Sequence, residues 1–339
     1  MASENWPITY PHYVPASSSF IELMKGATKA VVQCAAVKPG EKVVISTDTN
    51  KMRIAEALAA ATVTAGGVPI IVAIVPPGVH GAQLPQPVVA ACREADVFFL
   101  PTSYSQTHTD ARIEAIKNGA RGATMCDVTE DALCTGAILG DFEECDRLGR
   151  KLGAILDKTT EVRIRTERGT DIKGVIKGRP VQYETGLFRE PGRFGAFPDS
   201  EINISPIEGT AEGVIVADVR IMSVGVTRET PVTIEVKSGN ITDIKGGSQA
   251  EDFKAILKNL NDPTAYNIAE FAIGLNPCAR LYSTNLEDLG RLGNAHIGIG
   301  SNYSIGGKVK APCHIDAIFK DAVIEFDGKV VMDKGKVMI

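Results

Sequence analysis

Three consecutive pieces of sequence decide the fold: KVVIST (Lys42–Thr47), an Ala-rich segment over Lys51–Thr64, and VPIIVAIV (Val68–Val75). The first and third are short, apolar and rich in β-branched residues, which is typical of buried strands. The middle piece has the apolar spacing of a helix, and Gly66-Gly67 ends it. Buried strands separated by a helix indicate a parallel sheet that is covered on both faces.

The same alternation continues to about residue 157. Two further helix–strand pairs are expected, Gln86–Glu94 with Val97–Leu100 and Asp110–Asn118 with Ala123–Cys126. A helix over Asp141–Leu156 marks the end of this pattern. We therefore predict that residues 1–157 form an α/β domain with a mostly parallel sheet and helices on both of its faces.

Beyond residue 157 the pattern changes to short alternating strands, and tight turns are expected at Ser238-Gly239 and Asp327-Gly328. One helix, at about Ala250–Leu260, interrupts them. Residues 158–339 are therefore expected to form a β-rich, mainly antiparallel domain. Its predicted strands include Val162–Thr166, Gly174–Ile176, Gly213–Met222, Val232–Lys237, Asn240–Lys245 and several within Ile315–Met338.

Composition excludes several classes of protein. The chain has 339 residues and a net charge of −5 without a basic block, which argues against a nucleic-acid-binding protein. Its longest apolar run, Val68–Pro76, is too short to span a bilayer, and Met1–Ser18 does not resemble a secretory signal. Seven cysteines without a CxxC pair favour reduced thiols. We expect a cytoplasmic protein without a membrane partner.

Three residues of the second half are candidates for metal binding. His314 and Asp316 are two apart before an apolar β-type run, so on a strand both side chains point to the same face. Glu270 interrupts the apolar segment IAEFAIGL (Ile268–Leu275), where an unpaired carboxylate would cost several kcal/mol. Glu270 must therefore be neutralised, ion-paired or bound to a cation.

Two more candidates complete the set. His296 lies in GNAHIGIG (Gly293–Gly300), whose alternating glycines leave room for a group to approach the backbone. Glu201 opens a new segment after a loop containing Pro198, and by itself it would suit a solvated turn. Together the five residues offer nitrogen and oxygen ligands without sulfur, which favours zinc, cobalt, manganese or iron. Five ligands are also enough to hold two ions.

Other side chains could act on the substrate. Tyr303 could donate a hydrogen bond to a developing oxyanion, and Glu270 could move a proton instead of binding metal. His108 lies in a Ser/Thr-rich loop after a predicted parallel strand, where such folds place ligand contacts. Arg193 and Lys308 (or Lys310) could bind a substrate carboxylate. Alternatively, Tyr303 is a packed aromatic ring and His108 belongs to a helix-capping loop. The basic side chains are then ordinary solvated charges.

The second half resembles the aminopeptidase T family of metallo-aminopeptidases. The shared pattern comprises Glu201 after its Pro-containing loop, Glu270 before a GLNP segment, His296 with Tyr303 seven residues later, and a final His314-x-Asp316. Two stretches look closer to a divergent branch that includes 2,5-dihydroxypyridine 5,6-dioxygenase, a mononuclear iron enzyme. They are Glu190–Arg193 leading to Glu208–Gly213, and Gly306–Asp316.

The resemblance implies an aminopeptidase T-like, two-domain metal-dependent hydrolase. It would cleave an amide-type C–N bond of a short peptide or a small amide or lactam through water activated by two zinc, cobalt or manganese ions. The alternative is a non-heme Fe(II) dioxygenase that cleaves an N-heterocyclic ring such as a dihydroxypyridine. That enzyme uses a histidine where this chain has Glu270, so His296, His314 and Asp316 could form its facial triad. A non-catalytic binding protein is a third possibility. Family resemblance also implies a homo-oligomer, a dimer or larger.

Overall fold

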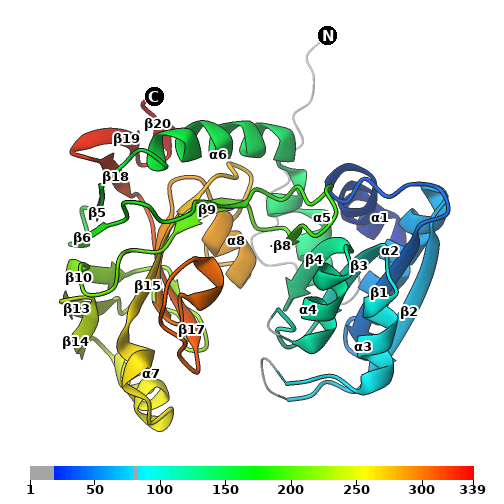
Figure 1. Ribbon diagram of the computed structural model, residues 1–339, viewed down its shortest axis with the longest axis horizontal. Helices are drawn as coiled ribbons and strands as arrows, with labels where there is room; N and C mark the ends of the chain where they lie inside the picture. The colour runs from blue at the N-terminus through cyan, green and yellow to red at the C-terminus, as the bar shows by residue number, and fades with distance from the viewer. Residues whose placement is uncertain (1–18, 79–81, 108) are drawn as a thin grey trace.

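The structure is a computed structural model that describes residues 19–78, 82–107 and 109–339. The chain forms two lobes that lie side by side (Figure 1). The N-terminal lobe contains a five-stranded sheet with helices, and the C-terminal lobe contains two antiparallel sheets of eight and seven strands. The predicted fold class, an α/β part followed by a β-rich part, is therefore confirmed.

The N-terminal sheet has the strand order β2-β1-β3-β4-β8, and all of its pairs are parallel. Consecutive residues of β1 point to opposite faces, so Val43 and Ile45 join one buried cluster while Val44 joins another. The first cluster includes side chains from α1, α2 and α5, and the second includes side chains from α3 and α4. Helices thus cover both faces. The elements are β1 (Lys42–Asp48), β2 (Val68–Ile74), β3 (Val97–Thr102), β4 (Arg121–Cys126), α1 (Phe20–Thr28), η1 (Lys29–Cys34), α2 (Met52–Thr64), α3 (Gln86–Arg93), α4 (Asp110–Lys117), α5 (Glu130–Cys134), η2 (Gly136–Leu139) and α6 (Phe142–Leu156).

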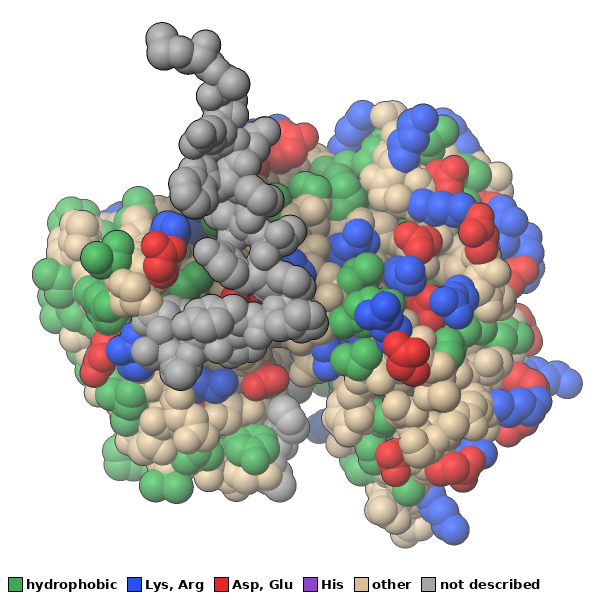
Figure 2. Space-filling view, turned by 180° about the vertical axis from the view of Figure 1, so that it is seen from behind, with side chains coloured by type: hydrophobic (Ala, Val, Ile, Leu, Met, Phe, Trp, Pro, Cys, Tyr) green, Lys and Arg blue, Asp and Glu red, His purple; other side chains and the backbone are tan. Residues whose placement is uncertain are grey.

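The burial expected for β2 is wrong. β2 is an edge strand that pairs with β1 alone, and Val68 and Ile70 are 50% and 38% exposed. Hydrophobic side chains accordingly lie on the outer border of the N-terminal lobe in Figure 2. A continuous apolar run predicts a strand of a parallel sheet, but it does not distinguish a central strand from an edge strand.

The lobes are joined by a strand from the second half of the chain. β8 (Phe194–Ala196) runs parallel to β4 and completes the N-terminal sheet. Its register places Gly122 opposite Phe194 and Thr124 opposite Ala196. The division of the chain after residue 157 stays a prediction, since β8 lies far beyond that point in sequence.

The two sheets of the C-terminal lobe enclose one large hydrophobic core. The seven-stranded sheet lies between the eight-stranded sheet and the N-terminal lobe (Figure 1). Among the helices that the structure describes, none combines the length and hydrophobicity that a bilayer crossing requires. The eight-stranded sheet comprises β14 (Asn240–Lys245), β13 (Val232–Lys237), β10 (Glu212–Ala217), β6 (Asp171–Val175), β5 (Glu161–Arg165), β18 (Val323–Phe326), β19 (Lys329–Asp333) and β20 (Lys336–Val337). The seven-stranded sheet comprises β12 (Gly225–Val226), β11 (Arg220–Ile221), β17 (His314–Phe319), β16 (Ala295–Gly300), β15 (Ile268–Gly274), β9 (Glu201–Ile204) and β7 (Gln182–Glu184). The remaining elements are α7 (Ser248–Asn259), η3 (Pro263–Tyr266), α8 (Asn285–Gly290) and η4 (Tyr303–Ile305).

Candidate metal centre

The seven-stranded sheet separates its apolar and polar side chains by strand alternation. On β16, Ala295, Ile297 and Ile299 belong to the hydrophobic core, so His296 points to the opposite face. The same alternation places Glu201, Glu270, His314 and Asp316 away from the core on their own strands. The five predicted ligands therefore share one face of one sheet, the face that is turned toward the N-terminal lobe (Figure 1).

Gly298 makes room for these side chains. It lies on β16 between Glu270 of β15 and Asp316 of β17, with which it is in register. A Cβ atom at this position would lie 2.7 Å from the Cβ of Glu270 and 2.8 Å from Nε2 of His314. Only glycine leaves this space open, as the alternating glycines of the segment led us to expect.

Glu270, His314 and Asp316 form the first of two compact clusters, which we call the His314 group. Nε2 of His314 lies 2.7 Å from Oε2 of Glu270 and 3.3 Å from Oδ1 of Asp316. Nδ1 of the same ring lies 2.7 Å from the carbonyl oxygen of Ser301. Because a carbonyl only accepts, Nδ1 carries a hydrogen and Nε2 is directed at the two carboxylates.

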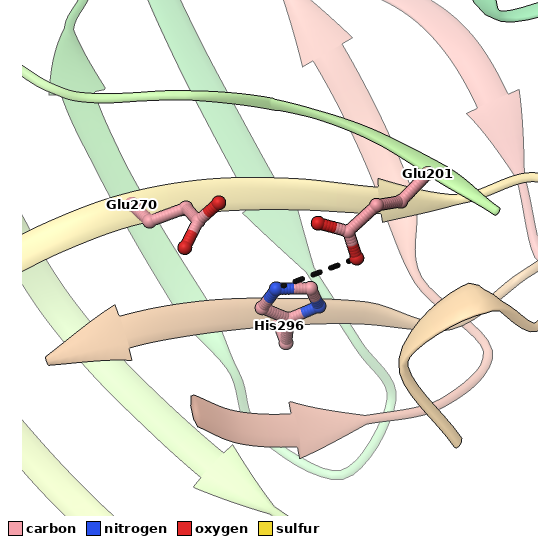
Figure 3. Close-up of side chains that lie close together, drawn as sticks. All are labelled: Glu201, Glu270 and His296. Carbon is pink, nitrogen blue, oxygen red and sulfur yellow. Dashed lines mark ion pairs between the residues drawn. The ribbon is translucent and has the colours of Figure 1, made fainter. Parts of the chain in front are cut away.

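Glu201, Glu270 and His296 form the second cluster, the His296 group, which is drawn in Figure 3. Nε2 of His296 lies 3.7 Å from Oε2 of Glu201, and Oε1 of Glu201 accepts a hydrogen bond of 3.0 Å from Asn203. Nδ1 of His296 has no hydrogen-bond partner within the described ranges. Glu270 belongs to both groups, so the two candidate ion positions would share this carboxylate.

Burial and crowding shift the pKa values of these acids. Burial, together with the charges of Asp199, Glu270 and Glu184, raises the pKa of Glu201 well above its usual value. Burial and the charge of Glu270 also raise the pKa of Glu184 to about 7. Burial opposes ionisation of Asp316 as well, but His314 and His296 outweigh it, so the pKa of Asp316 is lowered. Crowded carboxylates of this kind are stabilised by a cation.

Sequence reasoning missed two of these acids, Glu184 and Asp199. Burial, with the charge of Glu184, raises the pKa of Asp199 well above its usual value. Asp199 stands two residues before Glu201, so its position beside a predicted ligand could have signalled it. Glu184 has no such signal, because only the β7–β9 pairing brings it opposite Glu201.

The donors present fit a divalent metal ion. Oε2 of Glu201 and Oδ1 of Asp316 are buried and accept no hydrogen bond from any described residue. A buried carboxylate oxygen without a partner is unfavourable, and a bound cation would satisfy it. Three carboxylates and two imidazoles without a thiolate suit iron, manganese or zinc.

The other predicted site residues lie outside both groups. The Tyr303 side chain is 64% exposed, and its ring centroid lies 5.9 Å from the ammonium of Lys310. Arg193 and Lys308 are exposed. His108 lies outside the described residues. The proposed substrate contacts of Arg193, Lys308 and His108 stay predictions.

The chain has an aminopeptidase T-like fold that carries a buried carboxylate–imidazole cluster. The sequence model of the family described as NicX, 2,5-dihydroxypyridine 5,6-dioxygenase, matches residues 23–339. The chain belongs to this family.

Relatives point the same way. A 2,5-dihydroxypyridine 5,6-dioxygenase of Pseudomonas putida KT2440 is 32% identical over 196 residues, which is 54% of this chain and 56% of that protein. The match thus spans little more than half of the relative. The solved structure of 2,5-dihydroxypyridine dioxygenase from Pseudomonas putida KT2440 superposes with a TM-score of 0.80 at 23% identity, over 95% of this chain and 98% of that one. The structure of wild-type AmpT from Thermus thermophilus superposes with a TM-score of 0.70 at 15% identity, over 94% of this chain and 99% of that one.

These comparisons correct the predicted activity. The hydrolase, aminopeptidase and amidohydrolase assignments are wrong, because the family and its curated relative are dioxygenases. The likeness to AmpT, at 15% identity, extends to the fold. The oxyanion contact of Tyr303 and the proton transfer by Glu270 were proposed for the hydrolytic mechanism, and catalytic roles for these two residues stay predictions. The five ligand residues misled us because the same side chains can hold metal for either reaction.

Proposed function

We propose that the chain is a metal-dependent dioxygenase that opens an N-heteroaromatic ring, such as that of a dihydroxypyridine. The observation that carries this proposal is the combination of the family match over residues 23–339 with the buried His314 group. His314 and Asp316 form the His-x-Asp pair that the dioxygenase resemblance implied. Glu270 takes the third place, where that resemblance implied a histidine.

The His314 group would hold the catalytic ion. Its imidazole has one nitrogen occupied by the Ser301 carbonyl, and the other already faces two carboxylates at 2.7 and 3.3 Å. The proposed facial triad of His296, His314 and Asp316 is less compact, because His296 groups with Glu201 and Glu270 instead. A redox-active ion such as Fe(II) supplies, when bound, the electron transfer that dioxygen needs to react with an organic ring.

Neighbouring residues would orient the site and handle protons. Asn203 holds Oε1 of Glu201 through its side-chain amide and thereby leaves Oε2 directed at the centre. The Glu184 carboxyl lies opposite Glu201 in the β7–β9 pairing, where it would accept a proton from a ring hydroxyl of the substrate. The apolar strand faces behind the sheet exclude water from one side of the cluster.

The test is oxygen consumption by the metal-loaded protein. We would load the full chain anaerobically with Fe(II) and measure oxygen uptake with 2,5-dihydroxypyridine and its positional isomers. We expect one dioxygen consumed per substrate molecule, and both atoms of ¹⁸O₂ in the ring-opened product. Loaded protein that takes up no oxygen with any member of the panel would refute the proposal.

Matched variants tie the activity to the site. Asp316→Asn keeps the side-chain volume but removes a charge, and it should abolish uptake. Asp333→Asn makes the same change at an exposed position on β19 and should leave uptake unchanged.

A further inference from the structure

The N-terminal lobe presents a guanidinium group whose terminal nitrogens have no partner among the described residues. Arg112 lies in the first turn of α4, and its Nε donates a 2.6 Å hydrogen bond to the carbonyl oxygen of Thr107. Its guanidinium carbon lies 4.7 Å from the centroid of the Phe194 ring. Within the described part of the chain, Arg112 forms no ion pair and its two η nitrogens donate no hydrogen bond.

β8 connects this guanidinium to the metal centre. Phe194 and Ala196 are two apart on β8, so their side chains share a face about 7 Å apart along the strand. β8 lies beside β7, and Glu184 of β7 is opposite Glu201 in the β7–β9 pairing. Asn203 of β9 donates a hydrogen bond to Glu201 of the His296 group. Neighbouring strands therefore lead from the Phe194 ring under Arg112 to a candidate ligand.

The charge of Arg112 is not neutralised by Glu184. The two groups interact electrostatically, and burial lowers the pKa of Arg112 while Glu184 opposes this shift. They nevertheless form no ion pair within 4.0 Å among the described residues. A partly buried cation beside an acidic cluster, with its fork of donors unused, is suited to receive a planar anionic group.

The loop that orients Arg112 carries a second unused polar group. Gln106 is 1% exposed, and neither its amide nitrogen nor its amide oxygen has a hydrogen-bond partner in the described ranges. An unpaired buried amide is unfavourable unless another group satisfies its hydrogen-bonding capacity. Gln106 directly precedes Thr107, whose carbonyl holds Arg112. The segment thus combines a cation with an amide that can donate and accept.

We propose that Arg112 binds an anionic oxygen substituent of the substrate, a carboxylate or an ionised ring hydroxyl, at the end remote from the metal centre. The Phe194 ring holds the guanidinium plane, and the two η nitrogens form the bond. This assignment rests on the proposed function for the identity of the site. It explains how an acidic cluster receives an anionic substrate: the repulsion of Glu184 and Glu201 is offset by a cation from the other lobe.

The experiment measures binding in place of turnover. Isothermal titration of the metal-loaded chain under anaerobic conditions compares two ligand pairs, 6-hydroxynicotinate with 6-hydroxynicotinamide, and 2,5-dihydroxypyridine with its 5-O-methyl ether. We expect the wild-type protein to prefer the ionisable member of at least one pair by about tenfold, as a charged hydrogen bond provides. Arg112→Gln should lose that preference while its affinity for the neutral member stays within about twofold.

Further variants keep the test decisive. Arg112→Lys keeps the charge without the planar fork and should weaken the preferred ligand about threefold to tenfold. Arg93→Gln, at an exposed arginine of α3, should behave as wild type. If Arg112→Gln does not fold, the Lys variant alone decides.

A preference that survives Arg112 substitution in both pairs, or that is absent from both in the wild type, overturns the proposal. Loss in the first pair assigns the group to a carboxylate, and loss in the second assigns it to a ring hydroxyl. Because oxygen uptake is not read, failure of the dioxygenase proposal would be seen separately.

Discussion

The His314 group and the His296 group share Glu270 but are held in different ways. In the His314 group a main-chain carbonyl sets the imidazole, and the nearest carboxylate oxygen is 2.7 Å away. In the His296 group the imidazole has no hydrogen bond at Nδ1, and its nearest carboxylate oxygen among the described residues is at 3.7 Å. The main chain preorganises the His314 group, whereas packing positions the His296 group. We therefore expect the His314 group to bind metal more tightly.

The largest effect should come from the His314 group itself. His314→Ala removes the only imidazole of this group and leaves two buried carboxylates without it. We expect at least about a hundredfold loss in metal affinity and in oxygen uptake, because even outer-shell changes cost ten- to a hundredfold. Elemental analysis and an oxygen electrode provide the two measurements. If His314→Ala retained one metal ion per chain, the His314 group would not be the tighter of the two metal-binding groups.

Gly298→Ala should disturb both groups through Glu270. The added Cβ would meet Glu270 and His314 at less than 3 Å, so one of the two must move. We expect about a ten- to hundredfold loss in metal affinity with the fold retained. Gly195→Ala is the matched control, since a Cβ there would meet only Phe188, at 4.0 Å. Equal metal affinity in the two variants would contradict the role assigned to Gly298.

Glu201→Gln sharpens the comparison, because Glu201 belongs to the His296 group alone. We expect at most about a tenfold loss in affinity for the first ion, well below that of His314→Ala. Isothermal titration calorimetry with the metal ion measures the affinity of each variant. A loss as large as that of His314→Ala would show that the two groups act as a single unit.

The smallest effect concerns the stability of the metal-free protein. The pKa values of Glu184 and Glu201 are raised on folding, so the folded state keeps protons that the unfolded state has released. Stability therefore falls as pH rises from about 4.5 through about 7, by the linkage of protons to folding. We expect Tm of metal-free protein to fall over this range, and added metal to raise Tm more at pH 7.5 than at 5.5. Glu184→Gln should flatten the profile; an unchanged slope would exclude Glu184 as its source.

The sequence predicted which side chains cluster better than it predicted the reaction they serve. Glu270 was found because a carboxylate inside an apolar strand needs a partner, and His314 and Asp316 because strand alternation puts them on one face. The groups into which the five residues divide depend on strand register, which no local pattern reveals. The choice between hydrolysis and oxygenation was wrong for a different reason, because one set of metal donors can serve both reactions.

The N-terminal half shows a second limit of prediction from local sequence patterns. Its strands and helices were predicted from periodicity, but the exposure of β2 depends on its place at the sheet edge. Arg112 was not recognised, because its role depends on its contact with Phe194 of β8, which lies 82 residues further along the chain.

β8 also makes the two lobes mechanically dependent on each other. Ala196 is hydrogen-bonded into the N-terminal sheet, while Glu201, only five residues later, stands in the ligand-bearing sheet of the other lobe. A rotation that parted the lobes would pull on this short connection before any wide gap opened. Admission of a ring and alignment of a metal ligand would then be a single motion, and stiffening the connection would slow both together.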